Sequence, residues 1–296
     1  MHVIIFSMSK AQKIRFGVSV LLLFLLSLLI YFLLHITKSK DLKVSFLNIG
    51  QGDSIFIQTP SGIQMLVDAG PDKKVLSELS KVMPFYDRSI DIVLATHPDK
   101  DHIGGIPSVL QRYTVDTLIE SGSVSENGTY DELQNVANAL EQKNGLKRIR
   151  AYVGQSIDTN DNVSIDILYP DQDVKGLPTN DASIIVLIKY RTKTFLLTGD
   201  AAFETEYRLL HNPKLGKVTV LKVGHHGSQY STGSIFMDRI SPEYAVISVG
   251  KNTYGHPTKT VLDILDAFHA KTLRTDEKGL IQFVTDGDSI SYKTEK

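Results

Sequence analysis

Cysteine is absent from this chain of 296 residues. Its absence excludes disulfide bonds, thiolate metal sites and cysteine nucleophiles together. The chain also lacks an excess of positive or negative charge. It has 32 Lys and Arg residues and 33 Asp and Glu residues, so the formal net charge is −1. Without a global basic field, the chain can hold nucleic acid only through a local patch or through metal ions. The length and the hydrophobic share of 42% suit a globular protein with one large domain or two small ones.

One stretch of the sequence lacks charged residues altogether. From Phe16 to Ile36, FGVSVLLLFLLSLLIYFLLHI contains no Asp, Glu, Lys or Arg. As a helix it would span roughly 30 Å, the thickness of the hydrocarbon core of a bilayer. We expect residues 16–36 to be a single-pass membrane anchor. A cleaved signal peptide is the alternative, but its apolar region would be shorter and would end in small residues, whereas this one ends in HITKSK.

Basic residues flank the apolar stretch on both sides. They are Lys10, Lys13 and Arg15 before it and Lys38, Lys40 and Lys43 after it. Because the basic N-terminal flank of a first helix usually stays inside, we expect the remainder of the chain to be extracellular at the cell membrane. The expected organisation is a basic tail at 1–15, the transmembrane anchor at 16–36, a polar linker at 37–42 and a globular domain at 43–296.

Hydrophobic patterning in this domain alternates between strands and helices. Three strands open it, in LKVSFLNIG, DSIFIQT and IQMLVDAG, and turn residues between them predict antiparallel hairpins. Helices are then predicted at 73–83, 102–112 and 130–142, with strands at 91–95, 115–119 and 148–153. The second half repeats this order, with strands in VSIDILYP, ASIIVLIKY, KTFLLTGD, VTVLKVG and YAVISVG, helices at 202–210, from Ser231 and at 258–269, and terminal strands. Two such halves predict an α/β fold of two sheets packed face to face, with helices outside.

The loop ATHPDKDHIGG, residues 95–105, follows the apolar strand run DIVLA. It places His97, Asp99, Asp101 and His102 within six positions. Imidazole and carboxylate are the ligands of Zn, Mn and Fe sites, and two closely spaced metals need about this density of donors. The alternative is an acidic turn in which Asp101 caps the next helix. The density of donors favours a metal site.

Further potential ligands follow other strands. Asp200 ends KTFLLTGD, His225 and His226 follow VTVLKVG, and His256 lies in NTYGHP after a fourth strand. A carboxylate at the end of a buried apolar run needs a partner to be tolerated. Asp68, in MLVDAG, is expected to be a structural, hydrogen-bonded carboxylate.

The order of LVDAG, THPDKDHIGG, LLTGD and LKVGHHGS resembles the metallo-β-lactamase superfamily. The variant HPDKDH, with NIGQGDS before it and NDAS and YGHP after it, is similar to the hydrolase domain at the C-terminus of ComEC-type DNA-uptake proteins. The resemblance covers the chain from about Lys43 onward. It implies that residues 43–296 are a metallo-β-lactamase-like hydrolase domain, a four-layer αββα sandwich with a dinuclear metal site between the sheets.

The resemblance also implies the ligands of two divalent ions. His97, Asp99 and Asp200 would hold one metal, and Asp101, His102, Asp200 and one histidine of HHGS would hold the other. The sequence departs from the superfamily pattern twice: Asp99 replaces the second histidine of H-x-H-x-D-H, and no histidine lies between His102 and Asp200, where a further ligand is usual. Because the first site lacks two imidazoles, Mn²⁺ becomes at least as suitable as Zn²⁺.

The adjacent histidines His225 and His226 need separate roles. If strand geometry continues through them, their side chains alternate and cannot both face the metals. We expect His225, closest to the strand end, to be the ligand and His226 to face the substrate. Whichever of His226 and His256 is not a ligand is the natural proton donor to the leaving oxygen. The expected catalytic residues are His226, His256 and the metal ligand Asp101.

Two metal ions that activate water and hold the oxygens of an ester suit a phosphodiester especially well. The leading hypothesis is therefore a membrane-anchored phosphodiesterase with two Zn²⁺ or Mn²⁺ ions, a nuclease that acts on DNA. A cell-envelope phosphodiester, such as a phosphocholine or teichoic-type ester, is the alternative substrate. A β-lactamase is disfavoured because both departures fall in the first metal site, where that chemistry usually has three imidazoles. A non-catalytic anchored binding module is disfavoured because it would have lost ligands.

The sequence says less about other partners. No protein partner can be inferred, and one apolar span cannot by itself form a channel for DNA uptake. Basic residues near the proposed site could follow a phosphate backbone, but each is expected to be an ordinary solvated lysine. They are Lys100, Lys222, Lys251 and Lys259.

Overall fold

The computed structural model describes residues 9–36 and 40–296. The chain divides after Lys40 into an N-terminal unit and a unit from Asp41 to Lys296. Parts of the basic tail expected at 1–15 and of the linker expected at 37–42 lie outside the described residues. The second unit begins at Asp41, and the globular domain is expected at 43–296.

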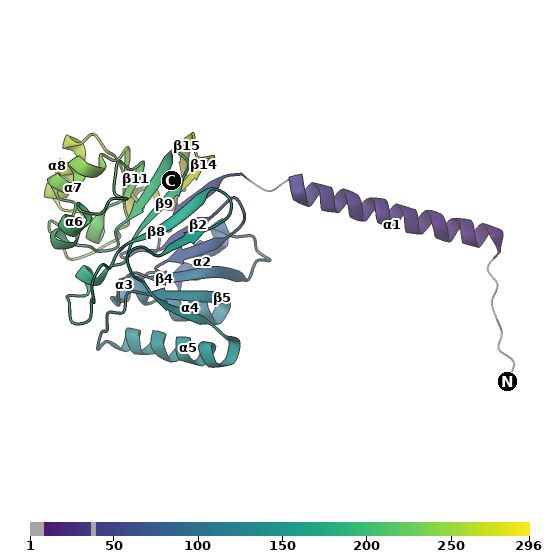
Figure 1. Cartoon of the computed structure of the whole chain (residues 1–296), viewed down its shortest axis with the longest axis horizontal. Helices are drawn as coiled ribbons and strands as arrows, with labels where there is room; N and C mark the ends of the chain where they lie inside the picture. The colour runs from purple at the N-terminus through teal and green to yellow at the C-terminus, as the bar shows by residue number, and fades with distance from the viewer. Residues whose placement is uncertain (1–8, 37–39) are drawn as a thin grey trace. The chain divides into compact units, whose positions relative to one another are not determined.

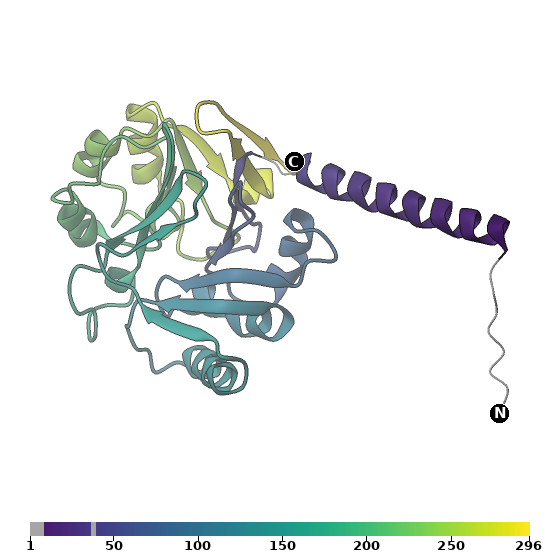
Figure 2. The same cartoon turned by 45° about the vertical axis from the view of Figure 1, so that its right-hand side comes forward.

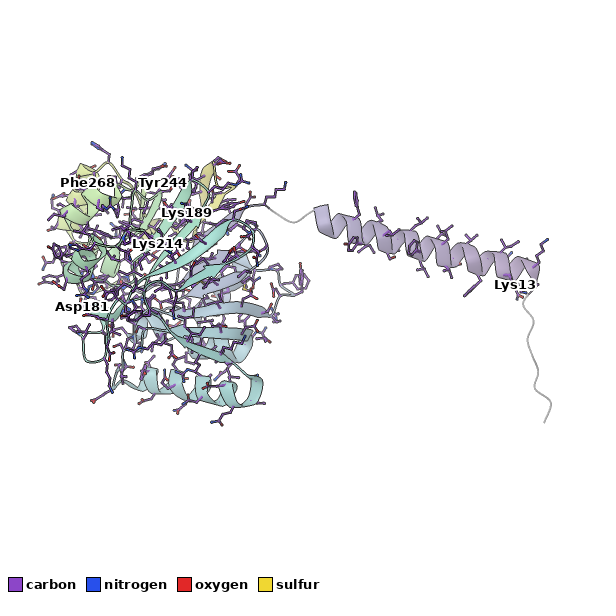
Figure 3. All side chains as sticks on the ribbon, viewed as in Figure 1. Lys13, Asp181, Lys189, Lys214, Tyr244 and Phe268 are labelled. Carbon is purple, nitrogen blue, oxygen red and sulfur yellow. The ribbon has the colours of Figure 1, made fainter. Side chains whose placement is uncertain are left out.

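The N-terminal unit is one helix, α1, from Lys10 to Ile36. It begins six residues before the uncharged stretch and so includes its basic N-terminal flank. Within the described residues, it is the one helix that is long and apolar enough to cross a membrane, with the candidate span at Lys10–Phe32. Its side chains from Lys10 to Phe32 are exposed and project on all sides of the helix (Figure 3). The hydroxyl of Ser27 donates to the carbonyl oxygen of Phe24 at 2.7 Å, which satisfies this polar group within the helix itself.

The described strands of the second unit form an eight-stranded and a seven-stranded sheet. In spatial order, the eight-stranded sheet consists of β15 (Ile290–Thr294), β14 (Ile281–Thr285), β1 (Leu42–Phe46), β2 (Ile55–Gln58), β3 (Gln64–Val67), β4 (Ser89–Ala95), β5 (Thr114–Glu120) and β6 (Lys147–Arg150). The seven-stranded sheet consists of β13 (Lys271–Arg274), β12 (Tyr244–Ile247), β11 (Val220–Lys222), β10 (Lys193–Leu197), β9 (Ile185–Tyr190), β8 (Val163–Tyr169) and β7 (Ser156–Asp158).

Helices cover the outer faces of both sheets (Figures 1 and 2). Those against the eight-stranded sheet are α2 (Lys74–Val82), α4 (Ile106–Arg112) and α5 (Gly128–Asn144). Those against the seven-stranded sheet are α6 (Phe203–Leu209), α7 (Ser234–Ile240) and α8 (Lys259–Ala267). Short turns of helix are α3 (Lys100–Ile103), α9 (Thr275–Lys278), η1 (Asn180–Ala182) and η2 (Gly224–Gly227).

The strand sequences explain this layering. In β10, Phe195 and Leu197 point into the core between the two sheets, whereas Leu196 points into the core under the helices. Successive side chains of a strand point to opposite faces, so a strand that is covered on both sides must be apolar throughout. The run FLL at the end of β10 meets this requirement. The αββα four-layer sandwich expected from the sequence is confirmed.

The helix predicted over 102–112 is broken in two. Gly104 and Gly105 separate α3 from α4, and a Cβ atom on either would lie 2.2 Å from a backbone oxygen, that of Pro71 or Ala69. The two glycines therefore allow the loop after β3 to pass directly against the HPDKDH loop. The backbone N–H of Ala69 donates to the carbonyl oxygen of His102 at 2.7 Å across this contact.

Two other sequence predictions need correction. The helix expected from Ser231 begins at Ser234, because Thr232 adopts a φ of 60°, outside the helical region. The terminal strands do not extend the second half of the fold, since β14 pairs antiparallel with β1, with Leu42 opposite Thr285. The first and last parts of the domain thus form neighbouring strands of one sheet.

Candidate metal centre

The parallel strands of both sheets end at the candidate site. β3 to β6 are parallel in one sheet, and β10 to β13 are parallel in the other. The carboxyl ends of parallel strands lie at one edge of a sheet, where sites commonly form. The residues that follow these ends are Asp68 after β3, His97 to His102 after β4, Asp200 after β10, His225 and His226 after β11, and His256 after β12.

His102 is fully buried, and both of its ring nitrogens face carboxylates. Its Nδ1 lies 2.8 Å from Oδ2 of Asp68, and its Nε2 lies 3.3 Å from Oδ2 of Asp200. Asp68 also accepts hydrogen bonds from the backbone N–H of Thr96 at 2.8 Å and from its hydroxyl at 2.7 Å. Asp68 is therefore a hydrogen-bonded carboxylate that orients the His102 ring and leaves Nε2 to face the site.

His97 is oriented by hydroxyl groups. Its Nδ1 lies 3.0 Å from Oγ1 of Thr96 and 3.3 Å from Oγ of Ser183, the serine of NDAS. The Ser183 hydroxyl also accepts a hydrogen bond from the backbone N–H of Asp200 at 3.1 Å. On the other side of the ring, Nε2 lies 3.6 Å from Oδ2 of Asp99. The NDAS motif thus links the HPDKDH loop to the loop that carries Asp200. The sequence of the motif did not indicate this role.

His226 also has a fixed ring. Its Nδ1 lies 2.8 Å from the carbonyl oxygen of Ser248, and its Nε2 lies 3.3 Å from Oδ2 of both Asp101 and Asp200. Because a carbonyl oxygen only accepts hydrogen bonds, Nδ1 carries the proton. In the neutral ring, Nε2 then presents its lone pair to the site.

The side chain of His225 lies in a more exposed place than that of His226, and strand geometry does not persist to either residue. β11 ends at Lys222, and both histidines adopt left-handed backbone conformations, with φ of 47° at His225 and 54° at His226. The premise that their side chains alternate as in a strand is therefore wrong. The His225 side chain is 26% exposed, and its Nε2 lies 3.9 Å from Oδ2 of Asp200, whereas the His226 side chain is 2% exposed.

Four buried imidazole nitrogens lack hydrogen bonds within the described chain. Three are the Nε2 atoms of His97, His102 and His226, and the fourth is Nδ1 of His256. Such atoms are costly to bury unless something binds them. Ligand atoms of His97, His102 and Asp200 lie within 4.8 Å of one another, and so do those of Asp101, His102 and His226. Nitrogen and carboxylate donors gathered at this spacing fit divalent metal ions.

The electrostatics of the site favour positive charge. Burial by itself lowers the pKa of His226, but the carboxylates of Asp200 and Asp101 outweigh burial and raise the pKa to about 9. Burial also opposes protonation of His102, yet Asp200 and Asp68 raise its pKa well above the usual range. For Asp99, burial would raise the pKa, but the contact with His97 lowers it. A site that holds protons this firmly also attracts metal cations, which compete for the same nitrogens.

Lys222 is not the solvated lysine expected from the sequence, because its side chain is completely buried. Its Nζ donates to the carbonyl oxygen of Gly199 at 2.7 Å, forms an ion pair with Asp53 and lies 3.4 Å from Oδ1 of Asp200. Charged groups are buried at this depth only when they are paired. Two features of the sequence could have indicated this ion pair. They are the lysine inside the apolar run VTVLKVG and the aspartate in the turn GQGDS.

The other basic residues considered from the sequence are exposed. Lys100, Lys251 and Lys259 all lie at the surface, and Lys259 pairs with Asp263 at 2.6 Å. His256 is half-buried, with its ring centroid 5.4 Å from that of His225. These two histidines form a rim beside the buried groups. Burial and the neighbouring His225 lower the pKa of His256.

Comparisons with known proteins show which family and which relatives this chain resembles. Residues 47–251 match the family model described as the metallo-beta-lactamase superfamily. The chain is 32% identical over 264 residues to ComE operon protein 3 of Bacillus subtilis, an alignment that covers 83% of this chain and 33% of that protein. Competence protein ComA of Neisseria gonorrhoeae is 29% identical over 255 residues, covering 82% and 32%. The chain thus spans about a third of the length of these relatives.

Solved structures show the same fold. The metallo-beta-lactamase fold protein YhfI of Bacillus subtilis superposes with a TM-score of 0.54 at 14% identity, over 82% of this chain and 100% of that one. Igni18, a metallo hydrolase of Ignicoccus hospitalis, superposes with a TM-score of 0.51 at 18% identity, over 81% and 98%. At these identities the likeness concerns the fold alone.

Proposed function

The chain belongs to the metallo-β-lactamase superfamily, and we propose that it is a membrane-anchored, metal-dependent phosphodiesterase that cleaves DNA. The observation that carries the proposal is the set of three buried Nε2 atoms, from His97, His102 and His226, turned toward carboxylates. This donor set fits two divalent ions. Bound ions of this kind supply Lewis acidity that activates water and stabilises charge on a phosphodiester.

The proposed ligands follow the contacts. His97, Asp99 and Asp200 hold one ion, and Asp101, His102, Asp200 and a histidine hold the other. For that histidine we propose His226 in place of His225, the residue expected from the sequence, because Nε2 of His226 lies closer to the carboxylates. Asp99 lies on the Nε2 side of His97 and stands where the superfamily pattern has a histidine. This oxygen donor in place of an imidazole favours Mn²⁺ over Zn²⁺.

Residues around the ligands take supporting parts in the proposed reaction. Asp68 and the Ser248 carbonyl hold the rings of His102 and His226, so that their Nε2 atoms need no rearrangement before metal binds. With His226 assigned as a ligand, His256 is the proposed proton donor to the leaving oxygen. Its half-buried ring lies on the rim beside that of His225.

DNA is the proposed substrate because the relatives include a protein named for competence. The full chain, purified in detergent, should be assayed with Mn²⁺ and with Zn²⁺ on single-stranded DNA, duplex DNA, RNA and bis(p-nitrophenyl) phosphate. An Asp200→Asn variant is the matched control. We expect Mn²⁺-dependent cleavage of DNA that this control lacks. Cleavage of only the small diester would favour an envelope phosphodiester, and no cleavage of any substrate would contradict the proposal.

For localisation, we propose that α1 anchors the chain in the cell membrane with the catalytic unit extracellular. Protease added to intact cells should then remove the chain from Lys43 onward and leave an anchored fragment. Protection in intact cells, with digestion only after lysis, would place the catalytic unit inside.

A further inference from the structure

The loop Gly250–Pro257, with the sequence GKNTYGHP, has a fixed shape at the rim of the site. Asn252 organises it from within. The Asn252 side-chain amide donates to the carbonyl oxygens of Gly250 at 2.9 Å and His256 at 2.8 Å. Its Oδ1 accepts from the backbone N–H groups of Tyr254 and His256, both at 3.1 Å. Four hydrogen bonds to one side chain hold the backbone on both sides of Tyr254.

This loop is also tied to the loops that carry the site. The N–H of Gly250 donates to Oε1 of Gln51 at 3.3 Å, and the N–H of Thr258 donates to the carbonyl oxygen of Gly227 at 2.9 Å. Gly227 directly follows His226, and a Cβ atom on it would lie 2.5 Å from Cβ of Pro257. The position of the loop is therefore set by the same segment that positions His226.

Aromatic rings lead from the buried site to solvent along this loop. The ring centroids of His225 and His256 are 5.4 Å apart, and those of His256 and Tyr254 are 5.8 Å apart. Tyr254 is 73% exposed, and its ring is tilted by 32° relative to that of His256. Within the described chain, no hydrogen bond engages its hydroxyl group. A large aromatic ring, open to solvent, thus projects from a fixed backbone beside the proposed proton donor.

We propose that Tyr254 is a stacking platform for an unpaired nucleobase of the substrate strand. This inference rests on the proposed phosphodiesterase function and adds a recognition site to it. Every base offers a flat π-face, so stacking on an exposed tyrosine binds strands without regard to sequence. Lys251, exposed on the same loop, supplies a positive charge for a neighbouring phosphate. Bases in a duplex are stacked on one another, so the platform selects single strands.

Because the chain contains no tryptophan, a Tyr254→Trp variant carries a single fluorescent reporter at the platform. The full chain in detergent, with Mn²⁺ present, is mixed in a stopped-flow instrument with a thymidine oligonucleotide or with an abasic oligomer of equal length. Tyr86→Trp is the control, because Tyr86 is 75% exposed at the turn before β4, at the opposite end of that strand from the HPDKDH loop. We expect saturable quenching only for Tyr254→Trp with the thymidine strand. Equal quenching by the abasic oligomer, or in Tyr86→Trp, overturns the proposal.

A kinetic test separates this inference from the function on which it rests. For each variant, kcat/KM on the thymidine oligonucleotide is divided by kcat/KM on methyl p-nitrophenyl phosphate. We expect Tyr254→Ala to lower this ratio about fivefold or more, as loss of one stacking contact would, and Tyr254→Phe to retain it. A ratio in Tyr254→Ala equal to that of the unmodified chain overturns the platform but leaves the phosphodiesterase. No hydrolysis of either substrate by the unmodified chain overturns both.

Discussion

The Nδ1 atom of His226 lies 2.8 Å from the carbonyl oxygen of Ser248. This one contact fixes which nitrogen of the ring carries the proton. It turns the other nitrogen, Nε2, toward Asp101 and Asp200, at 3.3 Å from a carboxylate oxygen of each. His225, one residue earlier, holds its Nε2 at 3.9 Å from Asp200 on the partly exposed rim. Adjacent histidines of identical chemistry are thus placed for different tasks.

The first prediction concerns these two histidines. His226→Ala is expected to lose about one equivalent of bound metal per chain, because it removes an inward-facing ligand nitrogen. His225→Ala is expected to keep both metals and to turn over more slowly. Elemental analysis of the full-length variants after incubation with Mn²⁺ measures the difference. Loss of metal in His225→Ala but not in His226→Ala would restore the assignment expected from the sequence.

A second prediction concerns the buried ion pair of Lys222 and Asp53. Lys222→Met leaves the Asp53 carboxylate buried without its partner and is expected to destabilise the domain by about 3 to 5 kcal/mol. The double variant Lys222→Met, Asp53→Asn is expected to recover much of that loss, because residue 53 then carries no charge and Asp200 keeps His102 and His226 as partners. Urea unfolding of the full chain in detergent, followed by near-UV circular dichroism, compares the two. Equal stability of the single and double variants would show that charge pairing is not the reason for the burial of Lys222.

The third prediction concerns metal preference. Asp99→His completes the H-x-H-x-D-H pattern and replaces an oxygen donor beside His97 with an imidazole. We expect this change to raise the affinity for Zn²⁺ relative to Mn²⁺, on the order of tenfold. Competition dialysis of the two metals measures the ratio of affinities. Asp263→His, which adds a histidine to the exposed face of α8, controls for nonspecific binding. An unchanged ratio would mean that Asp99 contributes no ligand.

The fourth prediction concerns the pH dependence of stability. It involves a residue that is not among the proposed metal ligands. Glu206 of α6 is buried, and its carboxylate accepts backbone hydrogen bonds from Thr232 at 2.5 Å and Gly233 at 2.9 Å. Burial outweighs these hydrogen bonds and raises the pKa of Glu206 from 4.5 to about 7. The folded state thus holds this proton more tightly than the unfolded state. The resulting stabilisation, about 3 kcal/mol in full, is present below pH 4.5 and is lost as the pH rises through about 7.

The Glu206→Gln variant tests this dependence, because its amide does not titrate. The free energy of unfolding of the unmodified chain is expected to fall relative to the variant between about pH 5 and pH 8. Both proteins should be measured with a chelator present, so that metal binding does not contribute. Parallel curves would mean that Glu206 keeps an ordinary pKa in the folded chain.

Much of the site was predictable because its residues follow apolar strand runs. The run DIVLA before HPDKDH and the run FLL before Asp200 are covered on both faces, so they could be recognised from composition alone. Their carboxyl ends fall together because the strands are parallel. The division of the chain after the apolar helix could be predicted for a similar reason, because an uncharged run of that length is rare in globular domains.

The remaining features depend on conformation or on distant partners. The difference between His225 and His226 comes from the left-handed backbone conformation of both residues. A histidine in the sequence does not indicate this conformation. The burial of Lys222 depends on Asp53, which lies in a different loop of the other sheet. The break of the predicted 102–112 helix depends on backbone passing close to Gly104, and only the structure shows that approach.

The pairing of β1 with β14 has a consequence for how the protein is made. β1 leaves the ribosome long before its neighbour on one side, Ile281–Thr285, is synthesised. Until then, Val44 and Phe46 belong to an open sheet edge, the kind of surface on which chains aggregate. Completion of this sheet therefore has to wait until β14 has been synthesised. A stop codon before Ile281 would leave every proposed metal ligand in the chain but would remove β14 and β15 from the sheet that carries the HPDKDH loop.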